Sequence, residues 1–387
     1  MSISGGRACV KALKTKVVGQ FGTDLLPPLQ TGQTNVWAPG MITRLQASRR
    51  EELTRMRQLH PESSGWRRWH DDETPVRLGL SSCLQGEAVR YDGGHSRDSF
   101  VVDTLGQWFE WVPVCPEMEI GMGVPRPTIR IEGDERATRL VSPSTGEDFT
   151  EQMARYAGRR VRQLSKSDLD GYILKKSSPS CGLGRIPVHG PKGGVRRNGV
   201  GFFASTLVKQ WPMLPVEDEG RLNDAVARES FIEQIFCRNR WRVLKRRGLS
   251  RRRLVAFHTA HELLLLSHNQ AGYRRMGKLI KGVGRVANRE LFSAYERELH
   301  TAMAMRTTKK KHMSVLRHAV DRLKENLDSR DRKEIALAIA DFGHGLLPLI
   351  VPLMLLRFHI RKYEATCLAG QIYFDPHPRE RMLRNHV

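Results

Sequence analysis

The chain has 387 residues, of which 40% are hydrophobic and 27% are charged, a composition typical of a soluble globular protein with room for two domains. Its formal net charge is +23, and residues 216–387 alone hold 34 basic and 19 acidic side chains. This excess predicts a polyanionic partner such as RNA, DNA or an anionic membrane surface. A generally basic proteome, or a role of the charge in solubility, is the alternative explanation of this excess.

The cysteine pattern and the apolar stretches narrow the class of protein further. Six cysteines lie far apart, which is not the pattern of a secreted disulfide framework: Cys9, Cys83, Cys115, Cys181, Cys237 and Cys367. The N-terminal residues lack the apolar run of a signal peptide, and the longest apolar stretch, 342–356, is too short to span a bilayer. We therefore expect a cytoplasmic protein with no membrane partner and no obligate protein partner. Its thiols would stay reduced and available to a metal.

Residues 1–75 have weak periodicity and many turn-forming residues, so they are predicted to be a poorly ordered N-terminal extension. From Val76 the pattern changes to three β-prone runs, each of which ends in a loop of small or polar residues: PVRLGLSSCL, FEWVPVCPE and GYILKKSSPSCGLG. Helical segments are expected between them, at 96–108 and 146–164. Residues 76–215 are thus predicted to form an α/β domain with a mainly parallel sheet, in which the three loops converge at one edge.

Beyond residue 215 the pattern is helical. Helices are expected at 219–248, at 250–268 with Ser250 as the N-cap, at 313–327 and at 331–343. Residues 216–387 are therefore predicted to form a mostly α-helical and strongly basic C-terminal domain.

Each of the three converging loops carries one cysteine, Cys83, Cys115 or Cys181. Soft thiolates favour iron–sulfur clusters or zinc, and three of them would leave one iron of a cluster open as a Lewis acid. Three unrelated buried cysteines are the alternative. The neighbouring residues favour metal-assisted hydrolysis, because every loop adds acid, base or hydroxyl groups to its thiol: Arg90, Asp92, His95, Glu117, Glu119, Arg126, Lys176, Ser177, Ser178 and Ser180.

The three loops SSCLQGEAVRYDGGHSRD, VPVCPEMEIGMGVPRP and KKSSPSCGLG resemble the signatures of the thiouracil desulfurase family. The second half resembles the helical domain that is often fused to it, through LVAFHTAHELLLLSH, GLLPLIVPLMLLRFHIRKY and QIYFDPHPRE. The resemblance covers about residues 76–381. The combination of the two domains is similar to the bacterial tRNA 4-thiouridine desulfidases, in which the helical domain is thought to engage tRNA.

The resemblance implies a function and a set of site residues. Cys83, Cys115 and Cys181 would hold a [4Fe–4S] cluster, and the enzyme would remove sulfur from 4-thiouridine in tRNA, giving uridine and sulfide by hydrolysis without net electron transfer. Glu117 is the first candidate for acid–base work, because it follows a cluster ligand by two residues. Ser178 matches the family's catalytic serine, and Asp92 is a weaker candidate for orienting water.

The basic domain contributes a second set of predictions. Clusters at 245–253, 273–285 and 306–312 are expected to follow phosphates, with Trp241 and Tyr273 available to stack on bases. Glu262 stands where the family more often has a lysine. The roles of His258, His261 and His377 stay open between structure and RNA contact, with metal binding disfavoured for the first two.

Two alternative functions stay open at this point. One is a desulfurase of free thiolated bases or nucleosides, with the helical domain serving oligomerisation. The other is a non-catalytic protein that binds a metal and nucleic acid.

Overall fold

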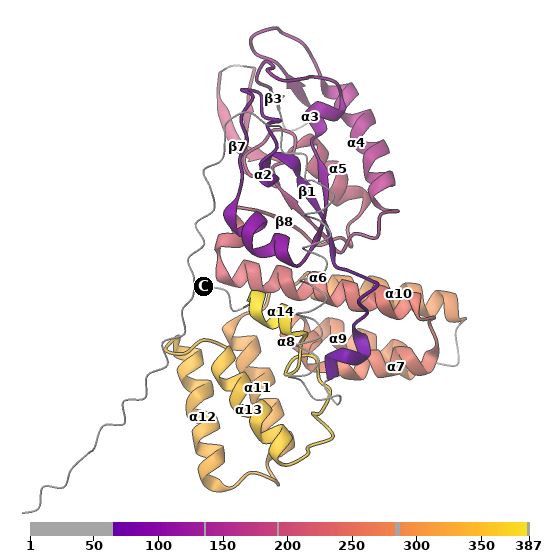
Figure 1. Cartoon of the computed structure of the whole chain (residues 1–387), viewed down its shortest axis with the longest axis vertical. Helices are drawn as coiled ribbons and strands as arrows, with labels where there is room; N and C mark the ends of the chain where they lie inside the picture. Colours follow the sequence, from indigo (N-terminus) through magenta and orange to yellow (C-terminus); the bar gives the residue numbers. More distant parts are fainter. Residues whose placement is uncertain (1–64, 135–136, 192, 283–286, 385–387) are drawn as a thin grey trace, which may run out of the picture. The chain divides into compact units, whose positions relative to one another are not determined.

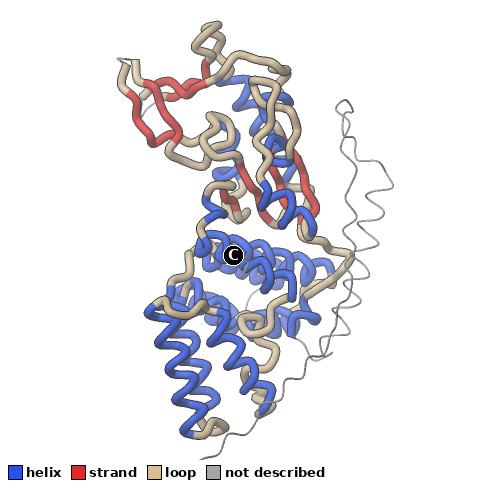
Figure 2. Tube along the Cα trace, turned by 60° about the vertical axis from the view of Figure 1, so that its left-hand side comes forward, coloured by secondary structure: helices blue, strands red, loops and turns tan. Residues whose placement is uncertain are grey.

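The structure, a computed structural model, describes residues 65–134, 137–191, 193–282 and 287–384. The predicted extension falls outside these ranges up to residue 64, and so does Cys9. In the described ranges the strands all precede Ala225, and only helices and connecting segments follow (Figure 1, Figure 2). This order confirms the predicted α/β region followed by a mostly helical region.

The first sheet, sheet A, contains four parallel strands in the order β2-β1-β5-β8. Its strands are β1 (Arg77–Ser81), β2 (Glu110–Val114), β5 (Gly171–Leu174) and β8 (Val216–Asp218). The three β-prone runs of the sequence form the adjacent strands β2, β1 and β5, so the predicted parallel sheet is confirmed. β8 carries the sheet past residue 215, where the α/β domain was expected to end, because a three-residue strand is too short to show an alternating pattern.

One face of sheet A is covered by α4 (Thr150–Leu164) and α5 (Phe202–Gln210), which pack on each other and on Tyr172 of β5. The Tyr172 ring lies directly on Gly79 of β1, where an added Cβ would be 2.1 Å from the ring. Only glycine fits at this position. The strand β5 is buried along its whole length, as expected for a parallel strand covered on both faces.

The other face of sheet A is covered by α6 (Ala225–Arg246), the first helix of the helical region. Ile235 of α6 packs so closely on β5 that a Cβ added to Gly171 would lie 2.7 Å from its side chain. Farther along the same helix, Trp241 lies in the hydrophobic core of the helical region. α6 therefore contributes to the cores of both regions.

A second sheet, sheet B, has the strand order β4-β3-β6-β7. Its strands are β3 (Arg130–Gly133), β4 (Thr138–Val141), β6 (Ile186–His189) and β7 (Val195–Gly199). β3 and β6 pair in parallel, and the two outer pairs are antiparallel. The sequence does not predict this sheet, because strands such as RIEG and VRRNG are short and lack apolar alternation. The predicted helix at 96–108 is likewise replaced by two short turns of π- and 3₁₀-helix.

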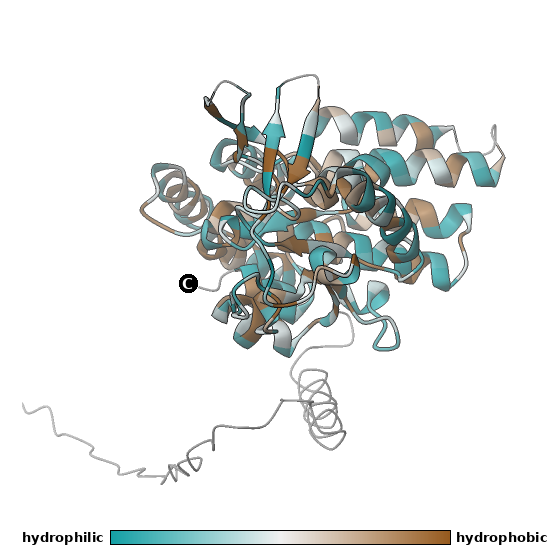
Figure 3. Cartoon of the chain, turned by 90° about the horizontal axis from the view of Figure 1, so that it is seen from above, coloured by the Kyte–Doolittle hydropathy of each residue, from teal (hydrophilic) through white to brown (hydrophobic). Residues whose placement is uncertain are grey.

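The remaining helices follow α6 in the chain. They are α7 (Arg251–Ala260), α8 (Glu262–His268), α9 (Gln270–Lys281), α10 (Asn288–Met303), α11 (Lys309–Leu323), α12 (Ser329–His344), α13 (Ile350–Lys362) and α14 (Pro378–Arg384). The helix expected at 250–268 is interrupted at His261, where the backbone leaves helical geometry, and Ser250 caps α7 as predicted. Hydrophobic and hydrophilic residues alternate along the helices (Figure 3). None of the helices in the described ranges combines the length and the apolar character needed to cross a membrane.

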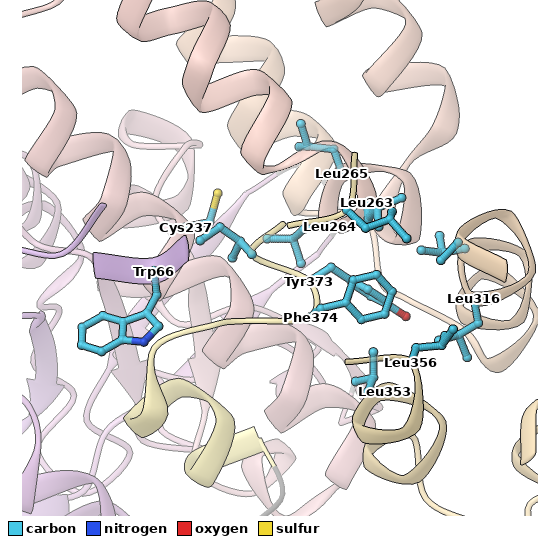
Figure 4. Close-up of a cluster of buried hydrophobic side chains, with 14 of the residues drawn as sticks. Trp66, Cys237, Leu263, Leu264, Leu265, Leu316, Leu353, Leu356, Tyr373 and Phe374 are labelled. Atoms are coloured by element: carbon cyan, nitrogen blue, oxygen red, sulfur yellow. The ribbon is translucent and has the colours of Figure 1, made fainter. Parts of the chain in front are cut away.

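The core of the helical region gathers side chains from helices far apart in the chain. Figure 4 shows Leu263 and Leu264 of α8 close to Tyr373 and to Leu316 and Leu356 of two further helices. All five side chains are buried. Tertiary packing of these apolar faces, rather than helix propensity, therefore holds the region together.

Residues 65–75 belong to the folded chain, although the sequence places them in the poorly ordered extension. Gly65–Trp69 form a short 3₁₀-helix. Trp66 and Trp69, which are 5% and 4% exposed, are part of the core of the helical region. Burial of the two tryptophan side chains stabilises this segment. The sequence does not predict it, because five residues are too few to show a helical periodicity.

Buried charges hold α14 to the rest of the helical region. Glu233 of α6 accepts a hydrogen bond of 2.8 Å from Nε2 of His268 and forms an ion pair of 2.9 Å with Arg384. Arg384 also bonds to Glu229 at 2.8 Å. Burial opposes ionisation of Glu233, but Arg384 and His268 outweigh it and lower the pKa of this carboxyl to about 2. Arg384 thus makes the largest single contribution that stabilises the ionised carboxylate.

Replacing Arg384 by methionine is expected to lower the free energy of unfolding by about 3–5 kcal/mol, because Glu229 and Glu233 would lose their buried partner. Urea unfolding followed by circular dichroism measures the loss. The matched control is Arg330→Met on the exposed surface of α12, which we expect to change the free energy by less than about 0.5 kcal/mol. Superimposable unfolding curves for wild type and Arg384→Met would show that these pairs do not hold α14.

Candidate active site

The three loop cysteines come together at the carboxyl edge of sheet A. Cys83 lies in the short helix α2 (Ser82–Gln85), directly after β1. Cys115 separates β2 from the short helix α3 (Pro116–Glu119). Cys181 lies in the turn that follows β5. Because β2, β1 and β5 are parallel neighbours, their loops meet at one edge, as the sequence predicts.

A pocket of about 350 Å³ opens between these loops. It is lined mainly by the three cysteines and by polar or charged side chains: Ser81, Ser82, Cys83, Arg90, Tyr91, Cys115, Glu117, Arg126, Thr128, Lys175, Lys176, Ser177, Ser178 and Cys181. The volume lies in the range of small-molecule sites. The arrangement therefore offers thiols, a carboxylate, hydroxyls and cations to one small ligand.

The carboxylate of the pocket belongs to Glu117, which is 9% exposed. The thiol of Cys115 donates a hydrogen bond of 3.5 Å to Oε2 of Glu117. Within the described ranges no cation forms an ion pair with Glu117 inside 4.0 Å. Glu119, the second carboxylate of the loop, instead pairs with Arg160 of α4 at 3.0 Å and does not line the pocket. Glu117 is thus the carboxylate that faces a ligand.

The third loop presents Ser178 in a fixed orientation. Oγ of Ser178 accepts hydrogen bonds from the backbone N–H groups of Ser180 (3.2 Å) and Cys181 (3.0 Å). The preceding residue, Ser177, has a φ of 61°, an uncommon conformation for a residue other than glycine. Ser180 is fully buried, and its hydroxyl finds no hydrogen-bond partner in the part of the chain that the structure describes.

Asp92 lies outside the pocket, next to the lining residues Arg90 and Tyr91. Its carboxylate accepts hydrogen bonds from the backbone N–H of Gly94 (3.0 Å) and from Arg90 (3.4 Å), which lower its pKa. The side chain therefore stabilises the turn of the first loop. This position disfavours the predicted role of Asp92 in orienting water. His95 likewise does not line the pocket and is exposed.

Two further residues support the loops of the pocket, and one of them, Glu219, is not among the residues that the sequence singled out. Glu219, just after β8, forms an ion pair with the ammonium group of Lys175, and its other oxygen accepts a hydrogen bond of 2.7 Å from the backbone N–H of Lys176. Arg126 bridges the first two loops by donating to the carbonyl oxygens of Val89 and Gly123, both at 2.9 Å. Glu219 could have been predicted if β8 had been recognised as the fourth parallel strand, because the carboxyl end of β8 lies at the same edge of sheet A as the three loops.

Burial dominates the electrostatics of the three thiols. It raises the pKa of Cys83 to about 11 and that of Cys115 to about 12, with Glu117 adding to both shifts. The pKa of Cys181 is raised in the same way, first by burial and then by Glu117, Cys83 and Cys115. The three thiols and Glu117 line the same pocket, which is why the carboxylate affects all three. All three are protonated at neutral pH while no cation is bound.

The other two cysteines in the described ranges lie elsewhere. Cys237 is buried in the helical core and Cys367 is exposed, both away from the pocket. In the same ranges no group of three or more His, Cys, Asp or Glu side chains is arranged to hold a metal ion.

The predicted basic clusters are partly engaged within the fold. Arg246 and Arg247 donate hydrogen bonds of 2.8 Å and 2.6 Å to the backbone carbonyl oxygens of Glu73 and His70. Lys311 donates to two backbone carbonyl oxygens, both at 2.6 Å. These cations stabilise the fold, so their expected contacts with phosphates stay a prediction. The cluster at 273–285 leaves the described ranges after residue 282.

The aromatic side chains expected to stack on bases are engaged inside the protein. Trp241 is 2% exposed and stacks on Tyr295 with 5.4 Å between the ring centroids, so the prediction that Trp241 stacks on RNA is wrong. Tyr273 lies parallel to His258, with 5.3 Å between the ring centroids. Its hydroxyl donates a hydrogen bond of 3.1 Å to Glu262. Neither ring presents two free faces to a ligand.

The histidines with open roles are part of the core. His258 bonds to the hydroxyl of Tyr295 at 3.2 Å, and Nε2 of His261 accepts a hydrogen bond of 2.9 Å from Arg240. Burial lowers the pKa of both rings, which keeps them neutral. His377 is buried as well. The structure thus favours the structural role over RNA contact for these three residues.

Comparisons with known proteins agree with this site. A model of the 2-thiouracil desulfurase family matches residues 78–219, and a model described as a protein of unknown function (DUF1722) matches residues 262–378. The three pocket cysteines, Glu117 and Ser178 all lie in the first match. A solved structure, that of the [4Fe-4S]-dependent thiouracil desulfidase TudS, is 29% identical and covers 38% of this chain and 94% of that chain, with a TM-score of 0.32.

Two curated relatives are similar to part of the chain. The uncharacterized protein YbgA of Escherichia coli K12 is 28% identical over 158 residues, which are 41% of this chain and 94% of YbgA. The uncharacterized protein YbbK of Bacillus subtilis 168 is 32% identical over 150 residues, which are 38% of this chain and 97% of YbbK. With its matched segment building the pocket, the chain belongs to the 2-thiouracil desulfurase family and carries a DUF1722 domain after the desulfurase domain.

Proposed function

We propose that this protein is a hydrolytic desulfidase that replaces the sulfur of a thiolated uracil base by oxygen and releases sulfide. The observation that carries the proposal is the pocket in which the thiols of Cys83, Cys115 and Cys181 lie beside Glu117 and Ser178. The family model supports the reaction class, because it matches the segment that builds this pocket.

The donor set of the pocket fits a [4Fe–4S] cluster. Cysteine thiolates are the usual ligands of iron–sulfur clusters, and each ligand binds a different iron atom. Zinc is the other metal that thiolates favour, and the metal analysis described below separates the two. Cys83, Cys115 and Cys181 would hold three of the irons. When bound, the cluster would supply an open Lewis-acidic iron to the sulfur of the substrate.

We propose that Glu117 moves the proton of the reaction. Its carboxylate faces the pocket, is almost excluded from solvent and has no ion-pair partner within 4.0 Å among the described residues. A carboxylate in this setting accepts a proton from water as the water attacks the carbon that carries sulfur. The same carboxyl group then returns the proton to the leaving sulfur, so the reaction needs no net electron transfer.

We propose that Ser178 donates a hydrogen bond to the substrate. Because its oxygen already accepts two backbone N–H bonds, the hydroxyl hydrogen is the part of the group that remains for a ligand. Accepting these bonds also polarises the hydroxyl and makes it a stronger donor. We propose that it stabilises negative charge that develops on the base during attack.

We further propose that the thiolated base belongs to a 4-thiouridine residue of tRNA and that the helical region binds the RNA. The 34 basic and 19 acidic side chains of residues 216–387 support an RNA partner. Arg90 and Lys176 line the pocket as well, where a nucleotide, unlike a free base, brings phosphate groups. The target uridine would have to leave its stack to enter the pocket.

The experiment that tests this function compares tRNA containing 4-thiouridine with free 4-thiouracil as substrates of the anaerobically purified protein. We expect sulfide release and loss of the 4-thiouridine absorbance, with a higher kcat/KM for tRNA. Turnover of the free base alone would support the alternative in which the helical region serves oligomerisation. Zinc in place of iron and acid-labile sulfide, with no turnover, would support the non-catalytic alternative.

Glu219→Gln is expected to lower kcat by about ten- to a hundredfold with unchanged iron content. The amide cannot form the ion pair with Lys175, so the loop that carries Ser178 would lose its fixed position. The matched control is Glu110→Gln, which breaks an ion pair of 2.8 Å with Arg77 at the opposite end of sheet A and should leave kcat unchanged. Equal kcat values for Glu219→Gln and the wild type would remove Glu219 from the set of positioning residues.

A further inference from the structure

A second cavity, of about 540 Å³, lies between the two regions of the chain. It is lined by residues of α5 and the segment that leads to β8, by α6, and by the turn between α10 and α11. We refer to it as the interdomain cleft. It shares no lining residue with the pocket of the three cysteines.

The interdomain cleft combines an apolar wall with a cationic rim. Val200 and Val208 are 40% and 43% exposed there, more than is usual for large apolar side chains. Lys209, Arg221 and Arg306 carry positive charge at the cleft, and Glu217 is the one carboxylate among its lining residues. Glu217 pairs with Arg221 at 2.8 Å and more distantly with Arg306 at 3.9 Å, so one carboxylate faces three cations and the cleft keeps an excess of positive charge. The cleft thus suits a ligand with an apolar body and an anionic group.

Trp211 gives the cleft a fixed aromatic surface. The guanidinium group of Arg238 lies over the indole ring, 5.3 Å from its centroid. Arg238 is itself held by hydrogen bonds to the carbonyl oxygens of Leu169 (2.9 Å) and Met213 (3.1 Å). The ring is therefore held in place before a ligand binds. Because the ring is already fixed, packing of a flat aromatic ligand on Trp211 would cost the protein little conformational entropy.

We propose that the interdomain cleft binds a nucleotide, with its base against Trp211 and the apolar wall and its phosphate at Lys209 and Arg306. Stacking on an aromatic ring together with cations for the phosphate is the chemistry by which proteins hold unpaired nucleotides. The nucleotide has two possible sources, a free nucleoside monophosphate and an unpaired residue of an RNA chain. Only the second source rests on the proposed function.

The cleft and the pocket lie on the two sides of one loop. Ser178 and Cys181 line the pocket, whereas Leu183, two residues farther on, lines the cleft. The first N–H groups of α5 donate to the carbonyl oxygens of Pro179 and Ser180 (2.9–3.1 Å), and the same helix presents its outer face to the cleft. An RNA chain held in the cleft therefore lies next to the loop that carries the third cysteine.

Isothermal titration calorimetry of the full chain with uridine monophosphate, uridine and a short oligouridylate tests the proposal. We expect the monophosphate to bind, and uridine to bind about tenfold more weakly because it lacks the phosphate. Trp211→Ala and Arg306→Gln should each weaken binding about tenfold or more. Trp211→Phe keeps an aromatic ring and the packing of the wild type, and should retain most of the affinity.

The matched control is Arg330→Gln, an exposed arginine on α12 outside the cleft, which should bind as the wild type does. Tighter binding of the oligouridylate than of the monophosphate would identify RNA as the source, and equal affinity would identify the free nucleotide. Unchanged affinity in both Trp211→Ala and Arg306→Gln, or no binding at all, would overturn the proposal. Desulfidation measured on the same samples separates this failure from failure of the proposed function.

Discussion

Replacing Cys115 by alanine is expected to reduce iron and acid-labile sulfide to background and to abolish desulfidation. The substitution removes one of the three thiols that surround the pocket, and the remaining two cannot hold a cluster with an open iron firmly. Iron and sulfide analysis of the anaerobically purified protein, with its visible absorption spectrum, measures the loss. Cys83→Ala and Cys181→Ala should give the same result.

Cys367→Ser is the matched control for the cysteine series, because Cys367 is exposed and lies outside the pocket. It should keep the iron content and the turnover of the wild type. Normal iron content in any one of the three pocket variants would contradict the three-ligand model. Circular dichroism of each variant separates loss of the cluster from loss of the fold.

Glu117→Gln is expected to lower kcat by about 10²- to 10⁴-fold while the iron content stays that of the wild type. The amide has nearly the volume of the carboxylate and keeps the packing of α3, but it cannot accept a proton from water. Single-turnover sulfide release from thiolated tRNA measures the effect on the chemical step. A normal spectrum with almost no turnover would separate the role of Glu117 from that of the cysteines.

Glu119→Gln is the matched control for this substitution. Glu119 lies on the same short helix, but it pairs with Arg160 and does not line the pocket. Its variant should turn over at close to the wild-type rate. Equal loss of activity in both variants would mean that α3 as a whole, rather than the carboxylate of Glu117, is required.

Most residues of the candidate active site could be predicted from the local sequence. Each of the strands β1, β2 and β5 is a β-prone run long enough to be recognised, and each ends in a loop with one cysteine. Because parallel strands bring their carboxyl ends to one edge, the meeting of the three loops followed from the pattern alone. Glu117 was predicted because it follows Cys115 by two residues, and Ser178 was predicted from the family resemblance, three residues before Cys181.

Residues that act across the sheet could not be predicted from the local sequence. Glu219 supports the third loop from the end of β8, a strand too short to recognise. Asp92 was a weaker candidate for the site, and its carboxylate bonds within its own turn. The sequence of the first loop therefore indicated the residue but not the direction of its side chain.

By itself the sequence determined the α/β region with its parallel sheet, the helical region, the basic character and the set of three loop cysteines. These features depend on local periodicity and composition. Only the tertiary structure decided that Trp241 is a core residue, that Arg246 and Arg247 hold the segment at residues 65–75, and that α6 closes both a sheet and a helical core. The physical reason is that burial and pairing depend on what packs on a side chain from far along the chain.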